Sequence, residues 1–400
     1  MRLSGRWTAS VIASTLLAAA TGCSLNAGAA KQTDIVIGAD LASTSPTDTA
    51  YTSALQLMVQ QVNASGQLGN RQLVLRIEDN HLDPTASLSN VSGLAADPAV
   101  AAIVLGSCGE CLALSAKTID EQKVPTIALA AADLRRIPAA GQHWIFKLGP
   151  NATDDAAAMR AELRRSGLRR IAVLYADDAA GTDAFAALTS NAGLRAAHLG
   201  LSATRKIKAA TGDQLTNKSV ADLKRAVRTL AATRPDAMVL LTGPDQANRA
   251  AIAARAAGFH GRLLLDAPAA GDLFLSTEAA GALDGARLVF AKALGIDDAI
   301  ATAPAATAQR EWLSDVTAAN GDFNGSTLFA ADAASLLARA VASAGGDRGG
   351  IREALETSVI DGLSGPIRLT ATNHSGLQAP ALTVLVARGG RWRLPVATER

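Results

Sequence analysis

The sequence has 400 residues, of which 49% are hydrophobic, 18% are charged and 3% are aromatic, and its formal net charge is +2. This length exceeds what one hydrophobic core usually organises, so we expect two lobes once any export segment is removed. The near-neutral balance argues against a disordered chain and against a nucleic-acid partner, and the few aromatic rings disfavour stacking on sugars or bases.

The N-terminal segment, residues 1–22, is predicted to be a signal peptide. Arg2 and Arg6 supply a basic start, and residues 7–19 form an apolar stretch that is too short to span a membrane comfortably. Residues 20–22 are small, as a processing site requires. The chain is therefore expected to be exported.

Cys23 directly follows Thr21 and Gly22, which resembles a bacterial lipobox. In that motif the cysteine is acylated and becomes the mature N-terminus, although Ala20 stands where leucine is usual. Residues 23–32 are then a lipidated tether that anchors the protein outside the bacterial cell membrane. The alternative, a plain signal peptide in which the cysteine has no role, stays open.

Beyond the tether, short β-branched runs alternate with helical stretches, which is typical of parallel sheets covered on both faces. The helices have apolar residues at helical spacing, as at Ala54, Leu57 and Met58. Strands with apolar centres are predicted at residues 34–40, 72–79, 100–106, 124–130, 170–176, 237–243, 262–267 and 287–293.

Two further stretches have a different pattern. Residues 205–218 are polar and lack periodicity, which predicts a surface loop leading into a helix that begins near Ser219. Residues 365–370 and 382–394 are predicted strands, and two adjacent glycines at 389–390 favour a hairpin in the second.

In the order of its predicted strands and helices, the sequence resembles the type I periplasmic binding proteins. The resemblance is to the branch that includes leucine and branched-chain amino-acid receptors. The matching segments cover nearly all of the chain beyond the tether, and their order is more specific than any one of them. They include IVIGAD at residues 35–40, QVNASG at 61–66, IVLG at 103–106, RIAVLY at 170–175 and IDGLSGPIR at 360–368.

The resemblance implies an α/β fold of two doubly wound parallel-sheet lobes joined by a three-strand hinge. The crossovers are expected near Leu148, Lys292 and Pro366. Lobe 1 then combines residues 33–148 with 292–364, and lobe 2 combines 149–291 with 365–400. In such folds hinge closure holds a ligand in the cleft between the lobes.

Parallel sheets bind ligands beyond the carboxyl ends of their strands, where helix N-termini offer free N–H groups. Turns and helix starts at these positions therefore predict the ligand contacts, although each residue is also a plausible loop or cap residue. The predicted ligand-binding residues are Ser43, Thr44, Ser45, Gly109, Glu110, Ala130, Ala132, Asp133, Asp178, Ala180, Thr242, Asp245 and Asp266.

The amino-acid receptors of this family hold the ligand with hydroxyls, amides, an acid and aromatic rings, and this sequence departs from that set. Glu110 or Gly109 stands where a serine is expected, Ala132 replaces a threonine and Ala180 replaces a tyrosine. These departures argue against an α-amino acid. The many cleft carboxylates instead suit a hydroxylated, amide-bearing or cationic solute.

Cys108 and Cys111 are the only thiols besides Cys23, and an exported chain folds in an oxidising compartment, so a short-loop disulfide is expected. A C-x-x-C at a helix start is also found in thiol-disulfide oxidoreductases, which keeps that enzyme class as an alternative. The histidines show no metal-ligand spacing, and no phosphate-cradling glycine loop or nucleophile elbow is present.

The resemblance implies a monomeric binding protein, not an enzyme, with no cofactor and no metal. It delivers a small-molecule solute to a membrane permease of an ABC importer, as in amino-acid transport, and contacts the membrane through its lipid anchor. A sensor or scaffold lipoprotein of the same fold is the alternative. The sequence does not name the solute.

Overall fold

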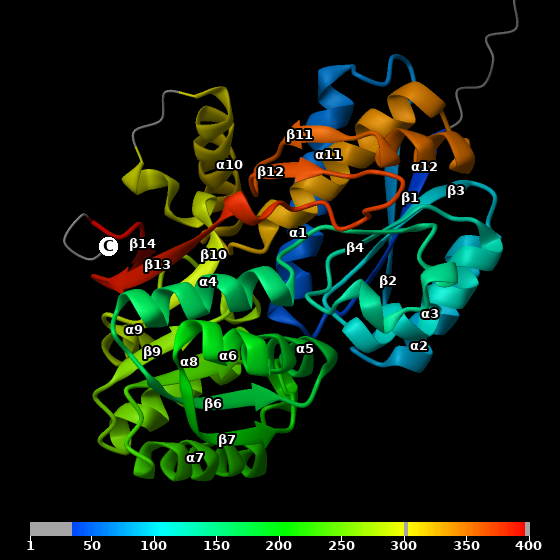
Figure 1. The fold of residues 1–400 in the computed structure, drawn as a ribbon. Coiled ribbons are helices and arrows are strands. Elements are labelled where there is room, and N and C mark those ends of the chain that lie inside the picture. The colour runs from blue at the N-terminus through cyan, green and yellow to red at the C-terminus, as the bar shows by residue number, and fades with distance from the viewer. Residues whose placement is uncertain (1–33, 300–302, 397–400) are drawn as a thin grey trace, which may run out of the picture. The chain divides into compact units, whose positions relative to one another are not determined.

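The computed structural model describes residues 34–299 and 303–396, so the predicted signal peptide and Cys23 lie outside the described residues. Two open sheets, each covered by helices, form the described part of the chain (Figure 1). The α/β fold predicted from the sequence is confirmed.

Sheet A is parallel throughout, with strand order β2-β1-β3-β4-β5. Its strands are β1 (Ile35–Leu41), β2 (Leu73–Asp79), β3 (Val100–Leu105), β4 (Thr126–Ala128) and β5 (Ile145–Lys147). The helices of this part are α1 (Pro46–Ser65), α2 (Pro84–Ala96), α3 (Gly109–Gln122), α11 (Thr327–Ala344) and α12 (Arg348–Glu356). We call sheet A with these helices lobe A.

Sheet B has strand order β14-β13-β10-β9-β8-β6-β7. Its strands are β6 (Arg170–Ala176), β7 (Gly200–Ile207), β8 (Ala237–Leu241), β9 (Arg262–Leu265), β10 (Arg287–Ala291), β13 (Leu382–Arg388) and β14 (Arg391–Arg393). The helices are α4 (Ala152–Arg165), α5 (Ala179–Leu188), α6 (Asn191–Ala197), α7 (Asn217–Ala232), α8 (Pro244–Ala256) and α9 (Thr277–Leu283). We call sheet B with these helices lobe B.

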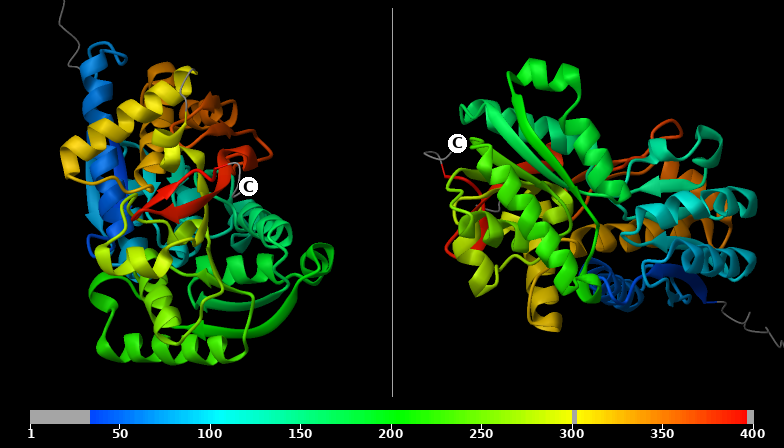
Figure 2. Two further views of the ribbon diagram at one scale, coloured as in Figure 1. Left: turned by 90° about the vertical axis from the view of Figure 1, so that its left-hand side faces the viewer. Right: turned by 90° about the horizontal axis from the view of Figure 1, so that it is seen from below.

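The chain passes between the lobes more than once, so segments far apart in sequence lie side by side (Figure 2). The backbone N–H of Lys147 donates to the carbonyl of His374 (2.8 Å), and the N–H of Gly376 donates back to the Lys147 carbonyl (2.9 Å). Near this connection, β11 (Val359–Asp361) and β12 (Pro366–Arg368) form a separate two-stranded sheet, and α10 (Pro304–Asn320) packs against α1. The exact residues at which the chain crosses between the lobes stay a prediction.

Local sequence signals explain where the helices next to the lobe interface begin. Ser45 caps α1 by accepting the N–H of Asp48, and Pro46 occupies the first helical turn, where its missing N–H costs nothing. Asp83 caps α2 in the same way, and Pro84 follows it. Helix α11 is apolar enough to cross a membrane by composition, but most of its residues are buried in the core.

The structure differs from the sequence prediction in several places, and β11 is one strand that was not predicted. Residues 205–207 belong to strand β7 rather than to a loop, and α7 begins at Asn217 rather than near Ser219. Strand β5 was not predicted. Sheet B is mixed rather than wholly parallel, because the predicted hairpin of β13 and β14 adds two antiparallel strands at its edge.

Candidate functional site

A cavity of about 1070 Å³ lies where the carboxyl ends of both sheets face each other. Lobe A lines it with Ser45 and Glu110, and lobe B lines it with Asp178, Thr242 and Asp266. This volume is slightly above the roughly 300–1,000 Å³ that small-molecule pockets usually have. The cavity therefore has room for a solute that contacts both lobes.

Asp266 is the least satisfied polar group of the lining. Its side chain is 1% exposed, and neither carboxylate oxygen accepts a hydrogen bond from the described residues. Burial raises the pKa of Asp266 well above its usual range, the charges of Asp155 and Asp178 raise it further, and the nearby backbone N–H groups of Asp266 and Ala269 offset this only in part. Since an unpaired buried carboxylate is costly, a donor group placed beside it by a ligand is strongly favoured.

Asp155, in the first turn of α4, is the acid whose charge raises the pKa of Asp266 most. One of its oxygens accepts the N–H of Ala267 (3.1 Å) and the other has no partner among the described residues. Burial raises the Asp155 pKa to about 7. Lys147 is the nearby buried cation, with its Nζ donating to the Pro150 carbonyl (2.6 Å), and burial lowers its pKa to about 8.

Two other carboxylates of the cavity already have partners at the start of α5. Oδ1 of Asp178 accepts the N–H of Gly181 (2.7 Å), and burial raises the Asp178 pKa. Oε1 of Glu110 crosses from lobe A and accepts the N–H of Ala179 (2.6 Å). These carboxylates therefore act as caps of a helix N-terminus, and they are less available to a ligand than Asp266.

The lobes also touch through direct contacts beside the cavity. Arg136 of lobe A pairs with Asp183 of lobe B, with Nε 2.7 Å from Oδ2, and also donates to the Ala179 carbonyl (3.0 Å). A Cβ at Gly109 would lie 2.6 Å from Cβ of Ala132 and 2.8 Å from Cβ of Ala179. Only glycine allows this approach of α3 to α5.

A second contact joins the turn after β1 to the loop that follows β7. Gly212 has φ +49°, and a Cβ added there would lie 2.5 Å from the Thr44 carbonyl oxygen. Asp245 holds this loop in place by accepting from Thr211 Oγ1 and from the Gly212 N–H, each at 2.9 Å. The cavity is therefore bounded on two sides by contacts between the lobes.

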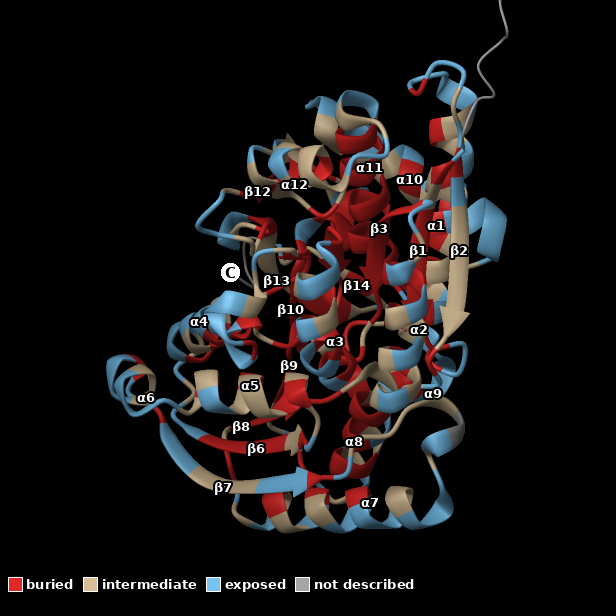
Figure 3. Cartoon of the chain, turned by 90° about the vertical axis from the view of Figure 1, so that its right-hand side faces the viewer, coloured by how far each residue is buried: buried red, intermediate tan, exposed pale blue. Residues whose placement is uncertain are grey.

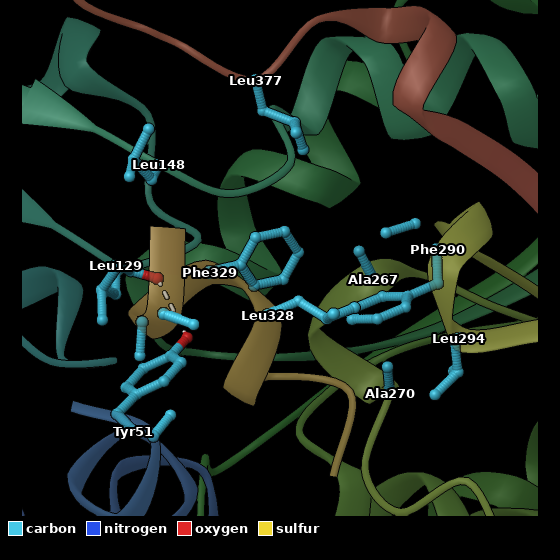
Figure 4. Close-up of a cluster of buried hydrophobic side chains, with 14 of the residues drawn as sticks. Tyr51, Leu129, Leu148, Ala267, Ala270, Phe290, Leu294, Leu328, Phe329 and Leu377 are labelled. Atoms are coloured by element: carbon cyan, nitrogen blue, oxygen red, sulfur yellow. Dashed lines mark hydrogen bonds between the residues drawn. The ribbon is translucent and has the colours of Figure 1, made fainter. Parts of the chain in front are cut away.

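One part of the lining is apolar and comes from both lobes. Its rings, those of Tyr51, Phe290 and Phe329, belong to the buried hydrophobic cluster that Figure 4 shows. Tyr51 of α1 donates its hydroxyl to the Leu129 carbonyl (3.2 Å), which leaves its ring against the cavity. Phe329 of α11 and Phe290 of β10 meet edge to face, with ring centroids 5.6 Å apart. A ligand with an apolar portion can therefore lie against rings while a polar end reaches the acids.

The two remaining cysteines lie at the N-terminus of α3. Their Sγ atoms are at bonding distance in the structure (1.98 Å), and Sγ of Cys108 accepts the N–H of Cys111 (3.1 Å). Cys108 lines the cavity and is 9% exposed, whereas Cys111 is 2% exposed. The C-x-x-C motif is thus part of the wall that carries Glu110.

The structure brings seven of the predicted ligand residues to the cavity lining. These are Ser45, Gly109, Glu110, Asp178, Ala180, Thr242 and Asp266. Their role in binding stays a prediction.

Six predicted residues lie outside the lining, each for a local reason. The Ser43 hydroxyl donates to Asp79, Thr44 and Asp245 take part in the loop contact, and Ala130 is buried in the core of lobe A. Ala132 packs against Gly109. Asp133 caps the short 3₁₀ turn Leu134–Arg136 and pairs with Arg135.

Several lining residues were not predicted. Tyr51, Phe290 and Phe329 have the same apolar spacing as their core neighbours, so the sequence offers no signal that separates them from core residues. Arg205, Lys206 and Lys208 were assigned to a surface loop. Their charge is the signal that could have marked them as part of a site.

Among residues 34–299 and 303–396, no group of three His, Cys, Asp or Glu side chains is arranged to hold a metal ion. The acidic residues of the cavity are spread over α3, the start of α5, α7 and the end of β9. Their arrangement suits separate hydrogen bonds to an organic ligand.

The sequence and the fold are similar to those of known proteins. The model of a family described as periplasmic binding protein matches residues 35–390. No curated protein matches the sequence.

Solved structures are similar in fold across nearly the whole chain. An extracellular ligand-binding receptor from Rhodopseudomonas palustris HaA2 is 20% identical with a TM-score of 0.78, over 91% of this chain and 100% of that one. A solute binding protein of an ABC transporter from R. palustris, in complex with benzoate, is 18% identical with a TM-score of 0.73, over 90% and 94%. A leucine binding protein from Thermotoga maritima MSB8 is 16% identical with a TM-score of 0.74, over 90% and 98%.

Proposed function

This chain belongs to the periplasmic binding protein family, and we propose from this premise that it captures a small polar solute outside the cytoplasm, in the cavity between lobes A and B. The observation that carries the proposal is Asp266, a buried carboxylate that accepts no hydrogen bond from the described residues and lines a cavity of about 1070 Å³. With the lobes together as they are here, such a group is costly without a solute and is satisfied by a bound donor.

The solute is one that donates hydrogen bonds, such as an amine, an amide or a polyol. Asp266, Asp178 and Glu110 offer acceptors and repel an anion. The benzoate found in the R. palustris neighbour is an anion, so a different specificity is expected here. A free α-amino acid is disfavoured because Ala132 and Ala180 lack the hydroxyls that the amino-acid receptors place there.

Capture works by closure of the two lobes around the solute. The bond from the Ala179 N–H to Glu110 and the ion pair of Arg136 with Asp183 form only when the lobes are together. The solute adds contacts to both lobes, so its binding shifts the population toward the closed state. No covalent step is needed for this function.

We also propose delivery of the solute to the permease of an ABC importer by a monomeric, lipid-anchored protein. The support for the anchor is Cys23 directly after a small-residue processing site. Membrane fractionation tests it, because Cys23→Ser should move the protein from the membrane pellet to the soluble fraction. Recovery of the variant in the pellet would reject the anchor.

The Cys108–Cys111 pair is proposed to be a structural disulfide that stiffens the first turn of α3. Both cysteines are buried, which disfavours exchange with a substrate dithiol. Mass spectrometry of the unreduced protein should show two hydrogens fewer than the reduced form. Robust insulin reduction that disappears with Cys108→Ser would instead establish an oxidoreductase.

The solute-capture proposal is tested by a thermal-shift panel of amino acids, polyols, sugars, amides, polyamines and benzoate at pH 8. An amine, amide or polyol should raise the melting temperature, and benzoate should not. Asp266→Asn should weaken the responding solute roughly 30-fold or more, because a buried charge-assisted hydrogen bond is lost.

The matched control is Asp284→Asn, which removes an exposed carboxylate of lobe B outside the cavity. It should leave the affinity unchanged. A responding solute whose affinity is the same in the wild type and in Asp266→Asn would overturn the assignment of the site.

A further inference from the structure

The cavity continues from its acidic end across β7 to one face of α7. In this outer part the lining carries the cationic side chains Arg205, Lys206, Lys208, Lys218 and Arg225. Among the residues that the structure describes, Asp222 is the one carboxylate of the lining there. The charges of the cavity are therefore segregated, with acids at the inner end and cations at the outer end.

Three of the outer cations have no counter-ion. Arg225 pairs with Asp222 (3.1 Å), and Arg205 donates to the Thr204 carbonyl (2.8 Å). The side chains of Lys206, Lys208 and Lys218 have no hydrogen bond and no ion pair within the described part of the chain. We call these three residues the lysine rim.

The lysine rim lies beside a strand edge that has no neighbour. Strand β7 ends sheet B, so the backbone N–H and C=O groups along its outer side have no partner strand. Figure 3 shows exposed residues along β7 and on the outer face of α7, while the inner face of α7 is buried. Lys218 and Asp222 lie four residues apart on the cavity face of α7, away from the buried Leu223 and Val227.

We propose that the solute is an elongated zwitterion, a short peptide, whose ammonium end reaches Asp266 and whose carboxylate end lies on the lysine rim. This inference rests on the proposed function and names the class of solute for the same cavity.

Size and charge separate a peptide from a free amino acid. In an amino acid the carboxylate is bonded to the carbon that carries the ammonium, so it would face Asp266 and Asp178 and be repelled. Each added residue moves the carboxylate outward by about 3.3 Å in an extended chain. Asp266 follows β9 and the rim begins at the end of β7, three strand spacings away in sheet B, or about 14 Å. With the reach of the lysine side chains, three or four residues place the carboxylate among the cations.

Isothermal titration calorimetry on the full chain tests this with alanine, dialanine, trialanine and tetraalanine, each as free acid and as C-terminal amide. The affinity should rise at least tenfold from alanine to trialanine or tetraalanine. The amide of the longer peptide should bind about tenfold more weakly than its free acid, since it has no carboxylate for the rim.

The variant Lys206→Ala/Lys208→Ala/Lys218→Ala should bind the acid and the amide equally. Its matched control is Lys224→Ala/Arg228→Ala, which removes two exposed cations of α7 outside the cavity lining and should keep the preference for the acid. Raising the salt concentration should reduce the preference in the wild type and have no such effect in the rim variant.

The inference is overturned if the longer peptides bind no more tightly than alanine, or if acid and amide bind the wild type equally. It is also overturned if the rim variant keeps the wild-type preference for the peptide acid and loses only the binding of an acidic segment of a protein partner. A non-peptide solute that still binds in an Asp266-dependent way would then leave the proposed function intact. If no solute of any class binds, both proposals fail.

Discussion

The two ends of the cavity hold opposite charges in opposite surroundings. Asp266 at the inner end is 1% exposed and has no hydrogen-bond partner among the described residues, whereas the lysine rim at the outer end is in contact with water. A charge out of water costs several kcal/mol unless it is paired, while an exposed charge costs almost nothing. The fold is therefore less stable because of the charge at the inner end of its site, and the charges at the outer end cost it almost nothing.

The largest expected effect is on the empty protein. Asp266→Asn should raise the free energy of unfolding at pH 8 by about 1–3 kcal/mol, because it removes an unpaired buried charge. Burial raises the folded-state pKa of Asp266, so the cost is absent below the unfolded value near 3.8 and grows as the pH rises through the folded pKa. Urea unfolding of both proteins should therefore agree at pH 4 and differ at pH 8.

An Asp266→Asn variant that is less stable than the wild type at pH 8 would contradict this prediction. It would mean that Asp266 is satisfied in the empty protein. Unfolding must be measured without added solute, because a bound solute stabilises the wild type by mass action.

The next effect concerns the affinity for a cationic solute. Binding requires the ionised form of Asp266, whose pKa is raised, so the dissociation constant should increase as the pH falls below that pKa. The limiting slope is about tenfold for each pH unit if one proton must leave. Calorimetry from pH 8 down to pH 5 measures it, and Asp266→Asn should give weak binding that varies little with pH.

The smallest expected effect is that of the lysine rim on stability. Replacing all three residues of the lysine rim by alanine should change the free energy of unfolding by less than about 0.5 kcal/mol, because exposed charges without partners add little to stability. Urea unfolding at pH 8 checks this. A loss of several kcal/mol would show that the rim is structural, and its role in solute binding would have to be reconsidered.

Much of the fold could be predicted because its signals are local. The apolar run at residues 35–41 and the cap and proline at Ser45 and Pro46 set β1 and α1 without help from distant residues. Strand β7 was missed because it lies at a sheet edge, where a strand can be polar and lacks an apolar centre. The three-residue strand β5 was missed because only its pairing with β4 distinguishes it.

Asp266 could be predicted as a site residue because it directly follows an apolar strand, and the carboxyl ends of parallel strands face the cleft. Phe290 and Phe329 could not, because a ring that lines a cavity has the same spacing as a ring in the core. The lysine rim was missed for a different reason, since its charges belong to a site only once β7 and α7 lie side by side.

The sequence by itself determined the α/β order, the starts of the helices and the edge of the sheets at which a ligand would lie, because each depends on neighbouring residues. Only the tertiary structure decided which carboxylate there remains unpaired. Asp245 is satisfied by Thr211 and Gly212, and Asp183 by Arg136 of the other lobe, while neither carboxylate oxygen of Asp266 accepts a hydrogen bond from the described residues. Those partners come from distant parts of the chain, and hydrogen bonds depend on distances in space rather than on positions in sequence.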